Sequence, residues 1–224
     1  MQEIIRLEDI CKSYGTRSGE LDVLRNINIS VYPGEFIAVT GQSGSGKSTL
    51  MNILGFLDRA DSGNYYFDGC TVTGMREKDI CEMRSRKIGF IFQSFNLIPD
   101  MNAIDNVMLP LIYRGVKRKE RECLARQALC KVGLSERMKH LPGEMSGGQQ
   151  QRTAIARAIA MSPRVLLADE PTGSLDKNSG REVLSVMKEM NRSGVTIVMI
   201  THDREIAASA GRQITISDGR IIDE

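Results

Sequence analysis

Short apolar runs alternate with helical patterns along most of this chain. Residues 36–39, 165–168 and 195–200 are apolar at all or nearly all positions. Runs of this length without alternation are typical of strands that are covered on both faces in a mostly parallel sheet. Residues 4–10 and 23–31 are predicted as two further strands, which makes the N-terminal third of the chain rich in strands.

Apolar residues also recur at helical spacing. Directly behind the strand predicted at 36–39, one such stripe predicts an amphipathic helix. Between residues 95 and 161 the pattern is again helical, and Gly133 is the expected stop of one helix. Asp-Gly pairs at 68–69 and 218–219 predict tight hairpin turns. The first stripe comprises Leu50, Ile53, Leu54 and Leu57, and the second comprises Leu124, Ala125, Ala128, Leu129 and Val132.

Composition and charge narrow the class of protein. A net charge of +2 and a pI near 8.3 give no electrostatic case for nucleic acid, so we expect no nucleic acid partner. The basic cluster at 114–126 is interrupted by Glu120 and Glu122, and it is either a solvated helix face or a contact for anionic lipid headgroups. The five cysteines are scattered, which indicates reduced thiols. The sequence has neither a membrane-spanning apolar run nor a secretion signal, so we expect it in the cytoplasm.

Residues 41–48 fit the phosphate-binding loop (P-loop) pattern Gly-x-x-x-x-Gly-Lys-Ser/Thr, between a predicted buried strand and a helix. The glycines let backbone N–H groups surround a phosphate, and the helix N-terminus adds partial positive charge. Lys47 is expected to bind the β and γ phosphates, and Ser48 to ligate Mg²⁺. This loop alone leaves kinase, GTPase and ATPase open. The candidate nucleotide-binding residues here are Gly41, Ser43, Gly44, Ser45, Gly46, Lys47, Ser48 and Thr49.

The strand predicted at 165–168 ends in two acids, Asp169 and Glu170. An acid at the end of such a strand usually emerges beside the P-loop. There Asp169 would hold the Mg²⁺ shell, and Glu170 would polarise an attacking water. The alternative is a surface acid pair that opens a helix.

Residues 145–152, Met145-Ser146-Gly147-Gly148-Gln149-Gln150-Gln151-Arg152, resemble the signature sequence of ATP-binding cassette (ABC) ATPases, usually written LSGGQ. Met145 replaces the leading leucine. Ser146 and the amides of Gly147 and Gly148 at a helix start would form a second phosphate-binding surface, completed by Gln149. In the family that this chain resembles, two cassettes enclose two ATP molecules, each between the P-loop of one subunit and the signature of the other. The resemblance therefore implies an ATP-driven dimer, here expected to be a homodimer.

The resemblance runs over essentially the whole chain and implies roles for four more residues. Tyr14 matches the aromatic residue that stacks on adenine. Gln93 matches the glutamine that senses Mg²⁺ and the attacking water, and Asp176 lies in the loop that communicates across the dimer. His202 matches the switch histidine near the γ-phosphate. With Glu170 present, the site is expected to hydrolyse ATP.

The same resemblance implies an α/β fold of the P-loop NTPase type. Its parts are a mostly parallel core sheet, an N-terminal antiparallel β subdomain and an inserted α-helical subdomain. We expect one nucleotide-binding domain over residues 1–224, with a RecA-like core at about 1–93 and 162–224 and the helical subdomain at about 94–161.

Several stretches, among them residues 90–99, 109–113 and 168–173, look most like the exporter branch of lipoprotein-release, macrolide-export and antimicrobial-peptide-resistance ATPases. That branch implies a separate permease with a large extracytoplasmic domain and a place on the cytoplasmic face of the membrane. Phe95, Leu97 and Ile98 are either a groove for a permease helix or core residues. The alternative function is a regulatory cell-division ATPase that controls a cell-wall hydrolase through a membrane partner.

Overall fold

The computed structural model describes residues 2–16 and 19–223 of the chain. Met1 and Glu224, the ends of the predicted domain, lie outside the described residues. The chain divides into two compact units, Met1–Arg84 with Gly194–Glu224, and Ser85–Ser193. The helical subdomain predicted at 94–161 falls inside the second unit, which also contains strands and a further helix.

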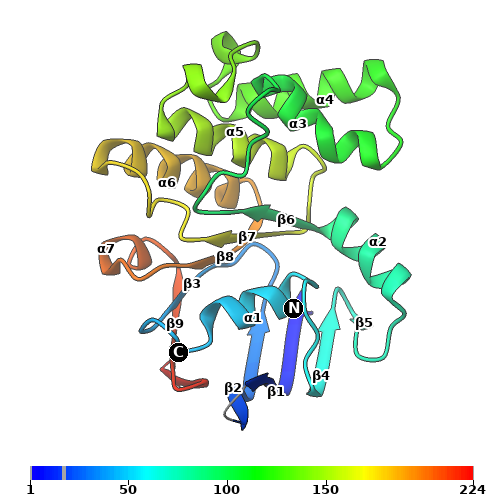
Figure 1. Cartoon of the computed structure of the whole chain (residues 1–224), viewed down its shortest axis with the longest axis vertical. Coiled ribbons are helices and arrows are strands. Elements are labelled where there is room, and N and C mark those ends of the chain that lie inside the picture. The colour runs from blue at the N-terminus through cyan, green and yellow to red at the C-terminus, as the bar shows by residue number, and fades with distance from the viewer. Residues whose placement is uncertain (1, 17–18, 224) are drawn as a thin grey trace. The chain divides into compact units, whose positions relative to one another are not determined.

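The first unit combines an antiparallel sheet with a mainly parallel one (Figure 1). The antiparallel sheet has the order β2-β1-β4-β5, and the strands of the other follow the order β10-β9-β3-β8. Strand β3 runs parallel to β8 and β9, and β10 pairs with β9 in the antiparallel sense. The strands are β1 (Ile5–Thr16), β2 (Gly19–Val31), β3 (Phe36–Thr40), β4 (Ser62–Phe67), β5 (Cys70–Thr71), β8 (Thr196–Ile200), β9 (Arg212–Ser217) and β10 (Arg220–Asp223).

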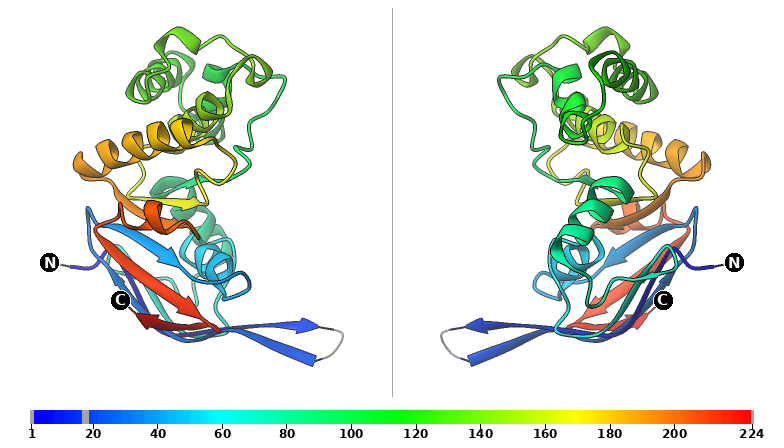
Figure 2. Two further views of the ribbon diagram at one scale, coloured as in Figure 1. Left: turned by 90° about the vertical axis from the view of Figure 1, so that its left-hand side faces the viewer. Right: turned by 90° about the vertical axis from the view of Figure 1, so that its right-hand side faces the viewer.

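Strands β1 and β2 are longer than the sequence predicts. They continue together as a ribbon that reaches away from the rest of the first unit (Figure 2). Apolar alternation ends near Ile10 on β1, and the ribbon beyond it is built mostly from polar residues. The hydrophobic pattern therefore gave no signal for this extension.

Helices of the first unit follow strands that are buried. Helix α1 (Lys47–Leu54) follows β3, and α7 (Arg204–Ala207) follows β8, whose five residues are all buried. Helix α2 (Glu77–Lys87) contains the division between the units. The stripe predicted for α1 is right except for Leu57: the helix ends at Leu54, Gly55 caps it, and the Leu57 side chain is 49% exposed.

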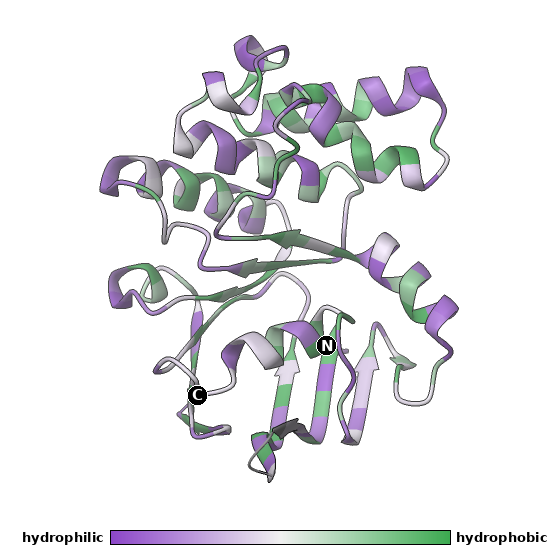
Figure 3. Cartoon of the chain, viewed as in Figure 1, coloured by the Kyte–Doolittle hydropathy of each residue, from purple (hydrophilic) through white to green (hydrophobic). Residues whose placement is uncertain are grey.

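The second unit packs helices with the parallel pair β6 (Ile88–Ile91) and β7 (Val165–Asp169). Its predicted stripe is buried at Ala125, Ala128 and Leu129, and Gly133 has the left-handed φ of 72° expected of a helix stop. Figure 3 shows the apolar colour along β6 and β7, while the helices alternate between apolar and polar residues. The helices are α3 (Ala103–Tyr113), α4 (Arg118–Lys131), η1 (Ser135–Arg137), η2 (Pro142–Glu144), α5 (Gly147–Ile159) and α6 (Lys177–Arg192).

Both predicted Asp-Gly turns are confirmed. Asp68 and Gly69 join β4 to β5, Asp218 and Gly219 join β9 to β10, and all four residues have positive φ, as such turns require. The five cysteines, all within the described ranges, are free thiols. Among the described residues, no helix combines the length and the apolar character needed to cross a membrane.

Candidate active site

The P-loop joins the buried strand β3 to the start of α1. Gly46 caps the helix in a left-handed conformation, with φ of 104°, so the first amides of α1 point into the loop. The first turn of α1, which is fully described, carries no acidic residue. Open amides and the positive end of the helix dipole together favour an anion at this position.

Close approach of neighbouring atoms explains two glycines of the P-loop. A Cβ atom on Gly46 would lie 2.7 Å from the backbone oxygen of Val23 and 2.8 Å from a methyl group of Leu24. A Cβ on Gly41 would collide with the backbone oxygen of Ile216. Strands β2 and β9 therefore press against the loop, and only glycine fits at these two positions.

The Lys47 side chain folds back into the P-loop. Its Nζ donates to the backbone oxygens of Gly41, at 2.8 Å, and Gln42, at 2.6 Å, and the residue is only 9% exposed. Ser48 at the mouth of the loop is exposed, and Thr49 is half-buried. A buried ammonium surrounded by neutral carbonyl groups is prepared for a phosphate, which would supply the missing negative charge.

Tyr14 lies on β1 and is 38% exposed. Its hydroxyl donates to Oδ2 of Asp58 at 2.6 Å, and this hydrogen bond is the main reason why the pKa of the phenol is raised. The same hydroxyl also interacts with the side chain of Thr49, so the aromatic residue reaches the helix of the P-loop.

His202 occupies the short turn between β8 and α7. Both neighbours of His202 fix this turn. Asp203 Oδ1 accepts from the backbone N–H groups of Glu205 and Ile206, and the Thr201 hydroxyl accepts from the Asp203 N–H. The imidazole itself is exposed. A side chain on a fixed turn at the carboxyl end of a buried strand suits a switch role.

In the second unit, the predicted catalytic and metal-binding residues lie at the ends of strands β6 and β7, with Gln93 after β6 and Asp169 and Glu170 at the end of β7. Asp169 ends β7, and Glu170 follows it with a left-handed φ of 45°. Gly173 lies between Glu170 and Gln93: a Cβ there would be 3.5 Å from Cβ of Glu170 and 3.0 Å from Nε2 of Gln93. Ser174 donates to the backbone oxygen of Gln93 at 3.0 Å. The structure therefore brings together Gln93 and Glu170, and a strained backbone at Glu170 is typical of functional sites.

Gln151, which is fully buried, was not predicted as a site residue. Its Nε2 donates to the backbone oxygens of Phe92, at 3.2 Å, and Pro171, at 2.6 Å, and so ties the segments that carry Gln93 and Glu170 to helix α5. Its Oε1 has no hydrogen-bond partner among the described residues. One signal was available: Gln151 shares a helical stripe with Ala154 and Ala158.

Arg157 was missed for a different reason. It donates to the backbone oxygens of Phe95 and Asn96, two residues with left-handed φ, at 2.8 and 2.6 Å. Burial lowers the pKa of its guanidinium. A sequence shows an arginine on a helix but not the irregular loop whose carbonyl groups it satisfies.

The predicted signature residues form the start of α5. Ser146 Oγ accepts from the Gln149 N–H at 3.3 Å, and the Gln149 side chain accepts from the Ser146 N–H at 3.1 Å, which is a reciprocal capping box. The first turn of α5, also fully described, has no acidic residue. This helix start therefore offers a second surface suited to an anion, as the sequence predicts.

Glycines 147 and 148 let α5 pack against the segment that starts α6. A Cβ on Gly148 would lie 2.9 Å from Cβ of Ser179, and one on Gly147 would lie 3.1 Å from a methyl group of Leu175. Asp176 caps α6 by accepting from the N–H groups of Asn178 and Ser179, and hydrogen bonds from Ser179 are the main cause of its lowered pKa. The signature and the segment with Asp176 thus form one packed surface.

Among the described residues, no group of three or more His, Cys, Asp or Glu side chains could hold a metal ion. Ser48 in the first unit and Asp169 in the second each offer an oxygen donor. Mg²⁺ commonly uses one or two protein oxygens and completes its shell with phosphate oxygens and water, so each of these residues suits Mg²⁺ bound with a nucleotide.

Known proteins similar to this chain agree on one family. A family model described as ABC transporter matches residues 24–173. The chain is 47% identical over 221 residues to the macrolide export ATP-binding/permease protein MacB of Pasteurella multocida (strain Pm70), with 99% of this chain and 34% of that protein covered. The chain thus spans about a third of the length of that relative. It is 46% identical to the uncharacterized ABC transporter ATP-binding protein YknY of Bacillus subtilis (strain 168), with 98% of this chain and 95% of that protein covered.

Solved structures give the same answer. The dimeric structure of MJ0796, described as a bacterial ABC transporter cassette, superposes with a TM-score of 0.88 at 39% identity and covers 98% of this chain and 97% of that one. A dimeric post-hydrolysis state of MJ0796 bound to ADP and Pi has a TM-score of 0.87 at 38% identity, with the same coverage. The predicted P-loop NTPase fold is confirmed. Since the family model covers well over half of the residues, and the chain matches YknY and the MJ0796 cassette over nearly their whole lengths, it belongs to the ABC transporter family and is one of its ATP-hydrolysing cassettes.

Proposed function

We propose that this chain is the ATPase subunit of an exporter-type ABC system, which dimerises on ATP and drives a separate permease. The observation that supports a dimer is that two helix starts, those of α1 and α5, have no acidic residue in their first turn and suit an anion, while only α1 also carries a lysine. A single cassette with two such surfaces suits head-to-tail pairing, in which each ATP is shared. The dimeric MJ0796 structures support this pairing.

For ATP binding, we assign the base to Tyr14 and the phosphates to residues 41–49. Lys47 would exchange its bonds to backbone oxygens for bonds to β- and γ-phosphate oxygens, so its ammonium remains paired throughout. Residues 146–149 of a second copy would bind the γ-phosphate through the amides at the start of α5, next to that copy's Asp176.

Hydrolysis is assigned to Glu170, Gln93 and His202. The Glu170 carboxylate accepts a hydrogen bond from the attacking water and orients it, with Gln93 placed beside Glu170 by Gly173. His202 donates toward the γ-phosphate as charge develops on it. Mg²⁺, held by Ser48, Gln93 and Asp169, would neutralise charge on the β and γ phosphates.

Transport is assigned to a membrane partner, on the cytoplasmic face. The likeness to MacB, whose name describes a macrolide export ATP-binding/permease protein, supports an exporter that acts with a permease. A large extracytoplasmic domain on that permease is a further part of the proposal. Phe95 and Leu97 are half-buried and Ile98 is 39% exposed, which supports their use as a contact for a permease helix more than as core.

The test is affinity purification of Glu170→Gln from detergent-solubilised native membranes with ATP and Mg²⁺, followed by mass spectrometry. We expect a permease with a large extracytoplasmic domain to copurify, and to be lost with the Lys47→Ala variant, which cannot hold ATP. Copurification of a cell-wall hydrolase regulator would favour the cell-division function instead. Recovery of soluble proteins alone would contradict the transport role and leave the ATPase activity standing.

A further inference from the structure

Tyr14 lies on a part of β1 that the sheet supports weakly. Strand β4 pairs with β1 as far as the Cys11–Ser62 pair, and Tyr14 pairs with Leu21 of β2 in the ribbon beyond (Figure 2). The register of β1 against β2 shifts between Lys12 and Ser13, which re-aims the side chains that follow. An isolated two-stranded ribbon is marginally stable in water, so backbone pairing alone does not fix the position of Tyr14.

Two carboxylates of the segment after α1, which we call the carboxylate clamp (Asp58 and Asp61), hold this part of the ribbon. Asp58 accepts from the Tyr14 hydroxyl at 2.6 Å and pairs with Lys12 Nζ at 3.2 Å. Asp61 pairs with Lys12 Nζ at 3.1 Å and accepts from the backbone N–H of Ser13 at 2.7 Å and from its hydroxyl at 3.0 Å. Three consecutive ribbon residues are therefore bound by two side chains.

Ionisation of the clamp agrees with this geometry. Burial, the largest influence on Asp58, raises its pKa, but hydrogen bonds from Tyr14, Arg59 and Lys12 bring the pKa below its usual value. The pKa of Asp61 is lowered, first by the backbone N–H of Ser13. Both carboxylates are thus charged at neutral pH and remain strong acceptors.

Lys12 determines which face of the tyrosine ring is open. The clamp holds its ammonium 5.1 Å from the ring centroid of Tyr14, over one face. That face is covered by a cation, so an aromatic base can stack on the opposite face alone.

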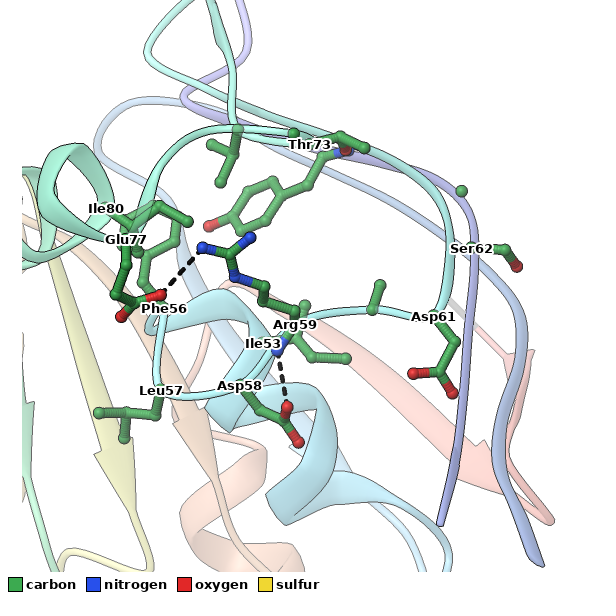
Figure 4. Close-up of a pocket in the computed structure, with 15 residues that line it drawn as sticks. Ile53, Phe56, Leu57, Asp58, Arg59, Asp61, Ser62, Thr73, Glu77 and Ile80 are labelled. Carbon is green, nitrogen blue, oxygen red and sulfur yellow. Dashed lines mark hydrogen bonds and ion pairs between the residues drawn. The ribbon is translucent and has the colours of Figure 1, made fainter. Parts of the chain in front are cut away.

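The clamp also has a fixed connection to the P-loop helix. After α1 ends, the backbone N–H groups of Leu57 and Asp58 return to the backbone oxygen of Asn52, within the helix, at 2.8 and 3.2 Å. Figure 4 shows Asp58 and Asp61 pointing to the side of this segment opposite to Arg59, which pairs with Glu77 at 2.9 Å. Asp58 therefore links the aromatic ring at one end to the phosphate-binding helix at the other.

We propose that Asp58 and Lys12 are positioning residues for nucleotide binding: the carboxylate clamp sets the distance from Tyr14 to helix α1 and leaves one ring face for the base. This inference rests on the proposed stacking of adenine on Tyr14. It extends that function to residues that touch neither base nor phosphate.

The test compares ligands with and without a base. Calorimetry would measure binding of adenylyl imidodiphosphate, a non-hydrolysable ATP analogue, and of inorganic tripolyphosphate, each with Mg²⁺. For Tyr14→Phe and Asp58→Ala we expect analogue affinity to fall about tenfold, with tripolyphosphate affinity unchanged within about twofold. The double variant should match Asp58→Ala alone, because both changes remove the same hydrogen bond.

Glu77→Gln is the matched control, because it breaks the ion pair on the other side of the same segment. It should leave both affinities within about twofold of the unmodified chain. The positioning role is overturned if Tyr14→Phe and Asp58→Ala keep full analogue affinity while Tyr14→Ala loses it, or if tripolyphosphate affinity falls in parallel. If Tyr14→Ala also keeps full analogue affinity, the base does not stack on Tyr14, and the proposed role of that residue fails with it.

Discussion

Gly44 and Gly46 have positive φ in the same loop but different surroundings. At Gly44, with φ of 78°, no described heavy atom lies within 4 Å of an added Cβ, whereas at Gly46 strand β2 is in contact. We expect Gly44→Ala to lower the free energy of unfolding by about 1–2 kcal/mol, the cost of left-handed backbone. For Gly46→Ala we expect a loss of about 3 kcal/mol or more and no measurable ATP binding.

Urea unfolding and calorimetry would measure this difference. Gly44→Ala serves as the control for backbone strain, since both substitutions add one methyl group at positive φ. Equal losses of stability in the two variants would contradict the proposed contact of Gly46 with Val23 and Leu24.

The Tyr14 phenol provides a second prediction for a single residue. Its pKa is raised above 10.0, first by the hydrogen bond to Asp58, so this bond is fully present below pH 10 and is lost as pH rises through the higher value in the folded state. The difference in ultraviolet absorbance between the unmodified chain and Tyr14→Phe isolates its phenolate. We expect Asp58→Asn to move that transition to lower pH, and an unchanged transition would argue against the bond.

Charged residues and glycines that recur at fixed spacing could be predicted from the sequence, because binding a phosphate requires them at those positions. Lys47, Gly41 and Gly46 are such cases. The roles of Gln151 and Arg157 could not be predicted, since their partners are backbone carbonyl groups of distant, irregular segments. The helical stripe of α5 indicates only that Gln151 is buried. Leu57 was misplaced because Gly55 ends the helix before the stripe is complete.

At the scale of the element, helix α5 has a cap that can be separated from its proposed function. Ser146→Ala removes the capping oxygen and should cost about 1 kcal/mol of stability. Ser146→Asp retains a capping oxygen and suits the helix dipole, so stability should be kept. The added negative charge would nevertheless repel a γ-phosphate, and we expect ATPase turnover to fall about a hundredfold.

Thermal unfolding and steady-state ATPase assays on the two variants test this separation. Asp176, which caps α6 through the same type of contact, indicates that an aspartate is accommodated at such a position in this chain. Full turnover in Ser146→Asp would show that α5 does not meet a phosphate.

Elements with a continuous apolar run were predicted at almost their observed bounds, as for β3 and β7. For α4 the stripe and Gly133 predicted the end of the helix but not its start at Arg118. The ribbon of β1 and β2 was not, because its residues bury little and are held by polar contacts to the carboxylate clamp. The hydrophobic pattern predicts elements that are buried, and it cannot predict a segment whose backbone is held by side-chain hydrogen bonds.

At the scale of the whole molecule, the two units each carry part of the expected chemistry. The first contains Tyr14, the P-loop and His202, and the second contains Gln93, Asp169, Glu170 and the signature. The sequence could not predict the residues at which the two units divide. The helices near the two boundaries, α2 and α6, are mostly polar, so their hydrophobic pattern does not assign them to either unit.

Dimerisation is the last prediction. With ATP and Mg²⁺, Glu170→Gln should bind the nucleotide without cleaving it, so light scattering should give about twice the monomer mass of 24.9 kDa. With ADP in place of ATP, light scattering should give the mass of the monomer. The double variant with Ser146→Asp should bind ATP in its own P-loop yet remain a monomer, because the repelling charge lies on the surface offered to the second copy. A dimer of equal strength in that double variant would place the contact away from the signature. Loss of ATP binding in it would mean that the signature acts within its own chain.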